Sequence, residues 1–360
     1  MKNSAKWVCV ALLFVPAFLS HAQGSTAIDA LQAKAAAGDA ESQNAVGLAY
    51  ENGRGVDMDL TQAMDWFQKA SDQGNPNAER NLALMLMDGK GGRQDISGAI
   101  KLLGKAAGQN FAAAQSTLGS ILITGGVVPQ DMSGGVKWLQ HAADQNYAEA
   151  EDQLGMLTLS GNGVVQSNPD AVKLLQKAAD QNYASAQEHL AGLYLDGTGV
   201  PQSDALAFQL ARQAAVQNYA QAESTVGWML SVGRGAAEDD AEAVKWLQRA
   251  ADQNYAEAEN TLGQIYESGK GVKQDYPAAV NLYRKAAQQG YGGAQNSLAI
   301  DCALGHGTDK DPVEALKWFE LAAAHGDKNG QDVRDSITRG MTAAQIAEAE
   351  KRVQSFRSSN

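Results

Sequence analysis

Hydrophobic, small and polar positions recur along this chain with a period of 36 residues. A small residue returns at that spacing without insertion, an aliphatic residue directly precedes it, and Ser or Ala lies five positions before it. These spacings place the three positions on one stripe of a helix. The recurring small residues, called the anchor row, are Gly47, Ala83, Gly119, Gly155, Ala191, Gly227, Gly263 and Ala299.

Each period also contains signals for helix ends. In most periods a Gly-x-Gly follows the anchor stripe. An Asp or Ser then precedes a second apolar stripe, where its side chain can cap a helix. Each period closes on Gly or Asn, the residues best suited to a left-handed C-terminal position. The predicted N-caps are Asp59, Asp95, Asp131, Ser167, Ser203, Asp239, Asp275 and Asp311. The predicted closing residues are Gly74, Asn110, Asn146, Asn182, Asn218, Asn254, Gly290 and Gly326.

Each period therefore predicts a helix hairpin, and stacked hairpins bury against their neighbours a face that none buries alone. The predicted fold is all-α, an α/α solenoid in which about eight 36-residue hairpins form a right-handed superhelix. We predict a signal peptide over 1–22, an N-terminal capping half-repeat over 23–38, the solenoid over 39–330 and C-terminal capping helices over 331–360. Within that last segment, one helix is expected near 331–338, and Thr342 should cap another that ends about Ser355.

The N-terminus has the pattern of an export signal. Lys2 and Lys6 precede an apolar run over 7–19, and a small-x-small pattern ends at Ala22. Cleavage near Ala22 would place the protein in the periplasm or the medium. An uncleaved anchor is the alternative, but the run is shorter than the roughly 20 residues that span a bilayer, and no stable membrane insertion is expected.

Composition restricts the partners. The net charge of −12 would become −14 after cleavage, because the signal contains Lys2 and Lys6 and no acid. An acidic protein lacks the basic face that nucleic acid requires and favours basic partners. With only Cys9 and Cys302 the chain cannot build a disulfide scaffold. Cys302 takes a position that is Tyr in other periods and lies on the packed stripe, which predicts a buried thiol.

The repeat resembles the Sel-one-like repeat family, a relative of the tetratricopeptide repeats. The resemblance rests on the unit that begins at Ala258, with its Leu-Gly pair, its Gly-x-Gly-Val over 269–272 and its Lys-Ala-Ala over 285–287, and it covers about residues 38 to 330. It implies a non-catalytic scaffold or adaptor that holds other proteins, often exported in bacteria. Some exported relatives with cysteine pairs have been described as β-lactamase-like or penicillin-binding, and this chain lacks those cysteines.

A search for catalytic or metal-binding motifs found none. Ser-x-x-Lys, Ser-Asp-Asn and Lys-Thr-Gly are absent, so a serine β-lactamase lacks its nucleophile. The histidines do not form His-Glu-x-x-His, and those at 306 and 325 are expected to be structural or solvated. We therefore expect no enzyme activity, cofactor or metal. A β-lactamase-like or peptidoglycan-related enzyme is the alternative function, and a purely mechanical spacer is a third class.

One register of the first helix is occupied by Glu or Gln in every period. A carboxylate and an amide that alternate at one position indicate hydrogen bonds between repeats rather than acid–base pairs, which need unlike environments within one cleft. This Glu/Gln row consists of Gln43, Glu79, Gln115, Glu151, Gln187, Glu223, Glu259 and Gln295.

The residues three before, one after and five after each anchor share another face of the first helix, which we expect to line the concave groove. Mixed polar and apolar residues there suit a peptide or protein segment. Trp228 is the predicted aromatic anchor, unless it tilts into the core between repeats; the face could also be plain solvated surface. The predicted binding residues are Trp228, Val232, Gln264, Ile300, Leu304, Met156 and Asp196.

Overall fold

The computed structural model describes residues 28–327 and 330–359, and all regular structure in these ranges is helical. The predicted signal peptide lies outside the described residues. Residues 28–36 form a helix, and Gly38 follows it with a φ of 99°. None of the described helices is long and apolar enough to cross a bilayer.

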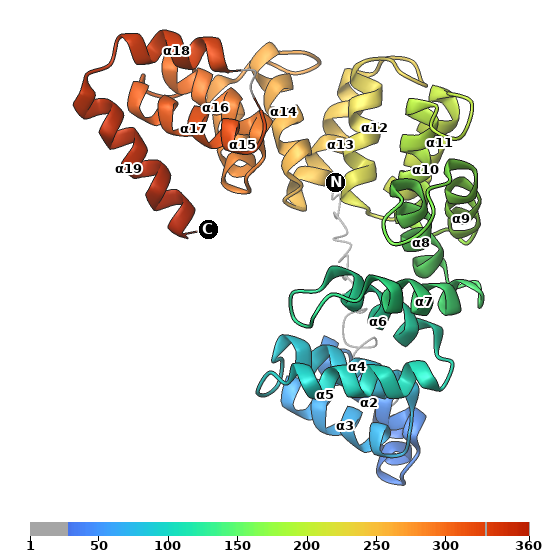
Figure 1. The fold of residues 1–360 in the computed structure, drawn as a ribbon. Coiled ribbons are helices and arrows are strands. Elements are labelled where there is room, and N and C mark those ends of the chain that lie inside the picture. The colour runs from blue at the N-terminus through green and yellow to red at the C-terminus, as the bar shows by residue number, and fades with distance from the viewer. Residues whose placement is uncertain (1–27, 328–329, 360) are drawn as a thin grey trace, which may run out of the picture. The chain divides into compact units, whose positions relative to one another are not determined.

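The chain divides into two units, residues 1–154 and 155–360, with the division inside helix α8. In the first unit, successive helix pairs form antiparallel hairpins in which each first helix packs mainly against the second helix that follows it (Figure 1). The first helices here are α2 (Ala40–Asn52), α4 (Pro76–Asp88) and α6 (Ala112–Thr124), and α8 (Ala148–Ser160) contains the division between the units. The second helices are α3 (Leu60–Asp72), α5 (Ile96–Gly108) and α7 (Met132–Ala143).

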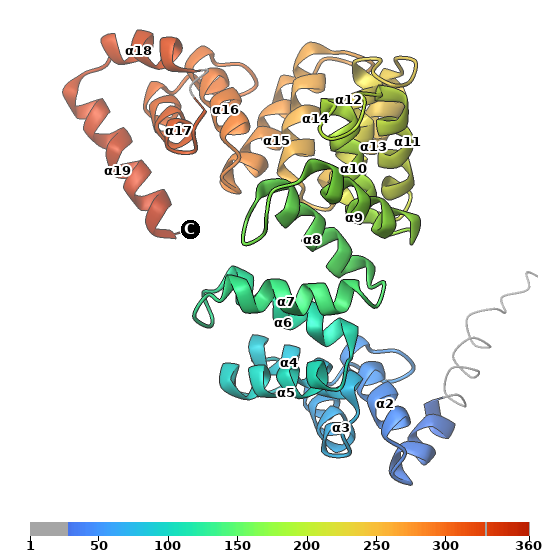
Figure 2. The same cartoon turned by 45° about the vertical axis from the view of Figure 1, so that its right-hand side comes forward.

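The second unit continues the same hairpins, and Figure 2 shows the pairs from another side. Its first helices are α10 (Ala184–Asp196), α12 (Ala220–Ser231), α14 (Ala256–Ser268) and α16 (Gly292–Leu304). Its second helices are α9 (Asn168–Asp180), α11 (Asp204–Ala215), α13 (Asp240–Asp252), α15 (Tyr276–Gln288) and α17 (Pro312–Ala324). The fold class is therefore all-α, an α/α solenoid of helix hairpins.

The predicted helix ends are confirmed. All eight predicted N-caps precede a second helix and accept a backbone N–H, as Asp59 does from Thr61 and Gln62 at 3.0 Å each. The five closing asparagines have φ between 57° and 65°. This left-handed conformation costs Asn less than other residues with a Cβ, and the remaining three closing positions are Gly with positive φ.

Two helices follow the last hairpin. Helix α18 (Gln331–Arg339) matches the expected position, and α19 (Ala343–Ser359) runs about one turn beyond the predicted end. Gln345 N–H donates to the Thr342 hydroxyl at 3.3 Å, and the Gln345 side chain accepts from Thr342 N–H at 2.9 Å, which is a reciprocal cap. Helix α19 covers α17, where Trp318 and Phe356 meet edge to face with centroids 5.4 Å apart.

Candidate functional site

The Glu/Gln row is buried and binds the second helix of its own hairpin. The side-chain amide of Gln73 donates to Gln43, that of Gln109 to Glu79 and that of Gln253 to Glu223, each at 2.7 Å. Both members of each pair lie in one hairpin, so these bonds within the repeat add to the predicted bonds between repeats.

The glutamines of the row also make the predicted bond to the preceding hairpin. The Gln115 amide donates to the Ala107 carbonyl at 3.1 Å, and the Gln295 amide donates to the Ala287 carbonyl at 3.0 Å. The prediction of inter-repeat hydrogen bonds is therefore confirmed for the glutamine members of the row.

Two glutamates of the row, Glu79 and Glu223, pair with a cation of their own hairpin. Lys105 Nζ lies 2.6 Å from Glu79, and Arg249 lies 2.6 Å from Glu223. Burial raises the pKa of Glu223, and the Arg249 guanidinium opposes that rise. Glu79 and Glu223 are thus neutralised within their own hairpins, which indicates a structural role for the row.

The three predicted groove rows differ in exposure. Residues one after the anchor are half-buried or exposed, and residues five after it are all exposed. Residues three before it are buried in every repeat except at Arg80, which corrects their assignment to the groove. The buried members are Asn44, Ser116, Asp152, Glu188, Ser224, Asn260 and Asn296.

These buried polar residues lie where neighbouring first helices contact each other. The Asn81 amide donates to Asn44 at 3.0 Å from the next first helix. The Thr225 hydroxyl donates to Glu188 at 2.5 Å in the same way. The periodicity of one helix does not reveal this contact, because it depends on how close the next helix lies.

All seven predicted binding residues lie one or five positions after an anchor, in residues 155–360. Trp228 exposes 36% of its surface, Val232 52% and Leu304 55%. Gln264 and Asp196 are exposed, whereas Ile300 and Met156 are half-buried. Ile300 packs against the buried cluster of α15–α17.

Trp228 has features of an exposed anchor for a partner and also of a residue packed into the core between repeats. About two thirds of its surface is covered, and the Arg234 guanidinium lies 5.7 Å from its ring centroid. Arg234 in turn pairs with Asp204 at 2.9 Å. The exposed third of the indole, beside a fixed cation, can contact a partner by stacking or by apolar packing.

A group of three ionisable side chains joins α14 and the end of α16. Glu267, Asp301 and His306 each offer a ligand atom, and these atoms lie within 4.8 Å of one another. Asp301 is 1% exposed, and its Oδ1 lies 3.7 Å from Nδ1 of His306. Burial, together with repulsion from Glu267, raises the pKa of Asp301 to about 7. From the sequence alone, His306 is predicted to be structural or solvated, and no metal ligand is expected there.

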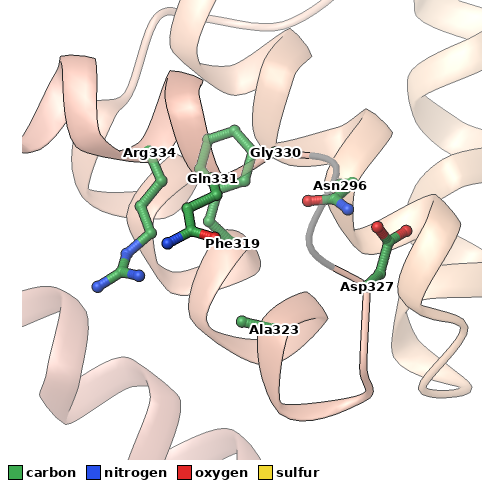
Figure 3. Close-up of a pocket in the computed structure, with 7 residues that line it drawn as sticks. All are labelled: Asn296, Phe319, Ala323, Asp327, Gly330, Gln331 and Arg334. Atoms are coloured by element: carbon green, nitrogen blue, oxygen red, sulfur yellow. The ribbon is translucent and has the colours of Figure 1, made fainter.

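A small pocket of about 250 Å³ lies where α16, α17 and α18 meet. Figure 3 shows Phe319 in its centre, with Arg334 and Asp327 on opposite sides. The volume is below the roughly 300–1,000 Å³ of typical small-molecule sites. The pocket belongs to the packing of the last hairpin against α18.

Comparison with known proteins identifies the repeat. The Sel1 repeat profile matches residues 40–75, 76–111, 112–147, 148–183, 184–219, 220–255, 256–291 and 293–327. The chain belongs to the Sel1 repeat family. Sel1 repeats generally serve as non-catalytic scaffolds that mediate protein binding, and this agrees with the resemblance seen in the sequence. A search of curated protein sequences found no match.

Two solved structures are similar over nearly the whole chain. A Sel1 repeat protein from Oxalobacter formigenes is 31% identical, with a TM-score of 0.56, and the match covers 92% of this chain and 97% of that one. A protective antigen present in uropathogenic Escherichia coli strains, which displays an SLR fold, is 26% identical with a TM-score of 0.51. That match covers 91% of this chain and 94% of the antigen.

Proposed function

We propose that this Sel1 repeat protein is an exported scaffold that binds an extended peptide or protein segment along the exposed face of its first helices α12 to α16. The observation that carries the proposal is the exposure of Trp228 on α12, of Val232 directly after α12 and of Leu304 at the end of α16. The exposed residues of α14, the first helix between them, are all polar. Exposed apolar side chains on a polar surface are typical of interaction sites, and Trp is enriched among binding hot spots.

A repeated helical face suits an extended ligand, because several weak contacts add along one segment. Gln264 lies on the first helix between those of Trp228 and Leu304 and offers a polar contact. The acidic net charge favours basic segments during encounter, and this effect weakens as salt shortens the Debye length to about 8 Å near 0.15 M.

Export is proposed from the charged and apolar pattern of residues 1–22. The similarity to a protective antigen also supports it. N-terminal sequencing of the protein from its native cells tests this part: we expect Gln23 as the first residue, in the periplasm or the medium. An intact Met1 on protein in the cytoplasm would overturn it.

The partner can be found by crosslinking and affinity purification from the native cell envelope. Trp228→Ala should weaken binding of the captured partner by about 2 kcal/mol or more, as hot-spot truncations do, while thermal unfolding stays unchanged. The matched control is Trp66→Ala, which removes a half-buried Trp beneath Lys69 on second helix α3. That control should bind as wild type does.

Two results would contradict the proposal. Equal affinity of Trp228→Ala and wild type for the purified partner would remove Trp228 from the binding face. A lower melting temperature of Trp228→Ala, with no specific loss of binding, would instead place the indole in the packing between repeats.

A further inference from the structure

Asp301 interrupts a row that is apolar in every other repeat. The residue two after the anchor is Ala, Met, Ile or Leu in the first seven repeats. In the eighth repeat it is Asp301, which is 1% exposed within the cluster that also buries Leu298 and Cys302. A carboxylate in this position gives up hydration that an aliphatic residue would not need. The apolar members of the row are Ala49, Met85, Ile121, Leu157, Leu193, Met229 and Ile265.

The protein compensates this carboxylate only weakly, because Nδ1 of His306 lies 3.7 Å from Oδ1, beyond hydrogen-bond distance. Oδ2 of Asp301 is buried without a hydrogen-bond partner, and Nδ1 of His306 also has none. The carboxylate of Glu267 also lies within 4.8 Å of this group and has the same sign. Two carboxylates and an imidazole that converge without hydrogen bonds among them are stabilised by a cation placed between them.

Surrounding side chains hold two of the three groups in place. The Tyr283 hydroxyl donates to Glu267 at 2.7 Å, and Tyr283 is fully buried where most other repeats have Leu or Phe. The His306 ring lies against Tyr276, with centroids 5.1 Å apart. Such outer contacts orient metal ligands.

We propose that Glu267, Asp301 and His306 form a binding site for a divalent transition metal of the Zn²⁺ class, which links the seventh and eighth repeats. Carboxylate oxygen and imidazole nitrogen are both Zn²⁺ ligands, whereas the imidazole disfavours Mg²⁺ and Ca²⁺. Tetrahedral bonds of about 2.0 Å need ligand atoms about 3.3 Å apart, so groups that now lie within 4.8 Å of one another must close by up to about 1.5 Å. His306 is 43% exposed, which leaves a route for the ion and room for a water ligand.

The site is tested on the full chain after removal of metal with a chelator. Titration with Zn²⁺, followed by competition with a chromophoric chelator, should give one tight site per chain. Co²⁺ at the same site should give the visible spectrum of four-coordinate oxygen and nitrogen ligands. Zn²⁺ should also raise the melting temperature, because it binds the folded state.

Three variants decide the assignment. Asp301→Ile installs the residue of the seventh repeat, and His306→Lys installs the residue that the seventh repeat has as Lys270. Each should weaken Zn²⁺ binding at least 100-fold and abolish the Co²⁺ spectrum. The matched control, His325→Gln, removes an exposed histidine from the same repeat and installs the residue that most repeats have there. It should bind Zn²⁺ as wild type does.

Absence of Zn²⁺ binding by wild type at 100 µM would overturn the proposal. So would unchanged affinity in either Asp301→Ile or His306→Lys. His306 lies in an exposed turn, so His306→Lys gives a decisive result even if Asp301→Ile does not fold.

Discussion

The third and eighth repeats follow the same 36-residue plan but fill it differently. In the third, Gly119 on α6 faces Gly135 on α7. The position of Gly135 is Ala in all seven remaining repeats. In the eighth, α16 and α17 bury Trp318 and Phe319, and α19 adds a further layer. The period therefore sets where helices begin and end, while the volume of the core is set separately in each hairpin.

The close contact in the third repeat has a local cause. A Cβ added at Gly135 would lie 2.6 Å from Cγ1 of Ile123 and 2.7 Å from the Gly119 carbonyl oxygen. Ile123 thus occupies the space that an Ala methyl would fill. The comparison teaches that a glycine within a helix can be a packing element rather than a weak point.

The largest expected change in the free energy of unfolding comes from removing a large side chain from the core of the eighth repeat. Phe319→Ala should destabilise the protein by about 3–5 kcal/mol, because Phe319 is 2% exposed. Leu139→Ala at the same register of the third repeat is the matched variant and should cost less. Denaturant unfolding measures the free energy of unfolding of both variants. A larger loss of stability in Leu139→Ala would contradict the expected difference between the two cores.

Gly135→Ala should destabilise the third repeat by about 1–3 kcal/mol, because the added methyl overpacks α7 against α6. The reverse change, Ala315→Gly at the same register of the eighth repeat, should cost about 1 kcal/mol or more, because it lowers helix propensity and removes a fully buried methyl. Thermal unfolding measures both. A stabilised Gly135→Ala variant would contradict the close approach of these helices.

For Gly104 in the second repeat we expect the opposite effect of a Gly→Ala substitution on stability. A Cβ there would meet nothing within 4 Å, so Gly104→Ala should stabilise α5 by about 1 kcal/mol. Hydrogen exchange should show α5 and α7 opening more readily than α13, α15 and α17 in wild type, and α5 should slow in the variant. Faster exchange in the later repeats would contradict this order of local stability.

The smallest effect concerns the thiol in the eighth repeat. Cys302 is 3% exposed, and burial raises its pKa to about 11, so the thiolate fraction at pH 8 is very low. Alkylation of the Cys302 peptide in the native protein at pH 8 should be more than 100-fold slower than in denaturant. Rapid native labelling would show that this core opens easily.

The sequence predicted what depends on neighbouring residues in the chain. The caps at Asp59 and its equivalents and the left-handed Asn110 and its equivalents are local, and all were found where expected. The burial of Asn44 and Glu188 was not predicted, because it comes from contact between first helices of different repeats. The hydrogen bond from Gln253 to Glu223 was likewise not predicted, because it depends on where the second helix of the hairpin packs.

The cluster around Asp301 had a signal in the sequence that motif searching missed. Metal motifs were sought as short spacings along one helix, whereas Glu267 and His306 come from different repeats. When the residues two after each anchor are compared across the eight repeats, Asp301 is the one acid among apolar residues. In repeat proteins, a residue that differs in chemistry from its equivalents in the other repeats is therefore a better guide to a special site than a short motif along one helix.

The pairing of Glu79 with Lys105, and of Glu223 with Arg249, has a consequence for how such chains evolve. Because acid and base lie in one hairpin, duplication or deletion of a complete 36-residue unit moves the pair together and leaves no charge stranded. Recombination that joins the first helix of one unit to the second helix of another can leave a buried glutamate without its cation. Inheritance of whole units is thereby favoured, which fits eight tandem copies in which the anchor row recurs without insertion.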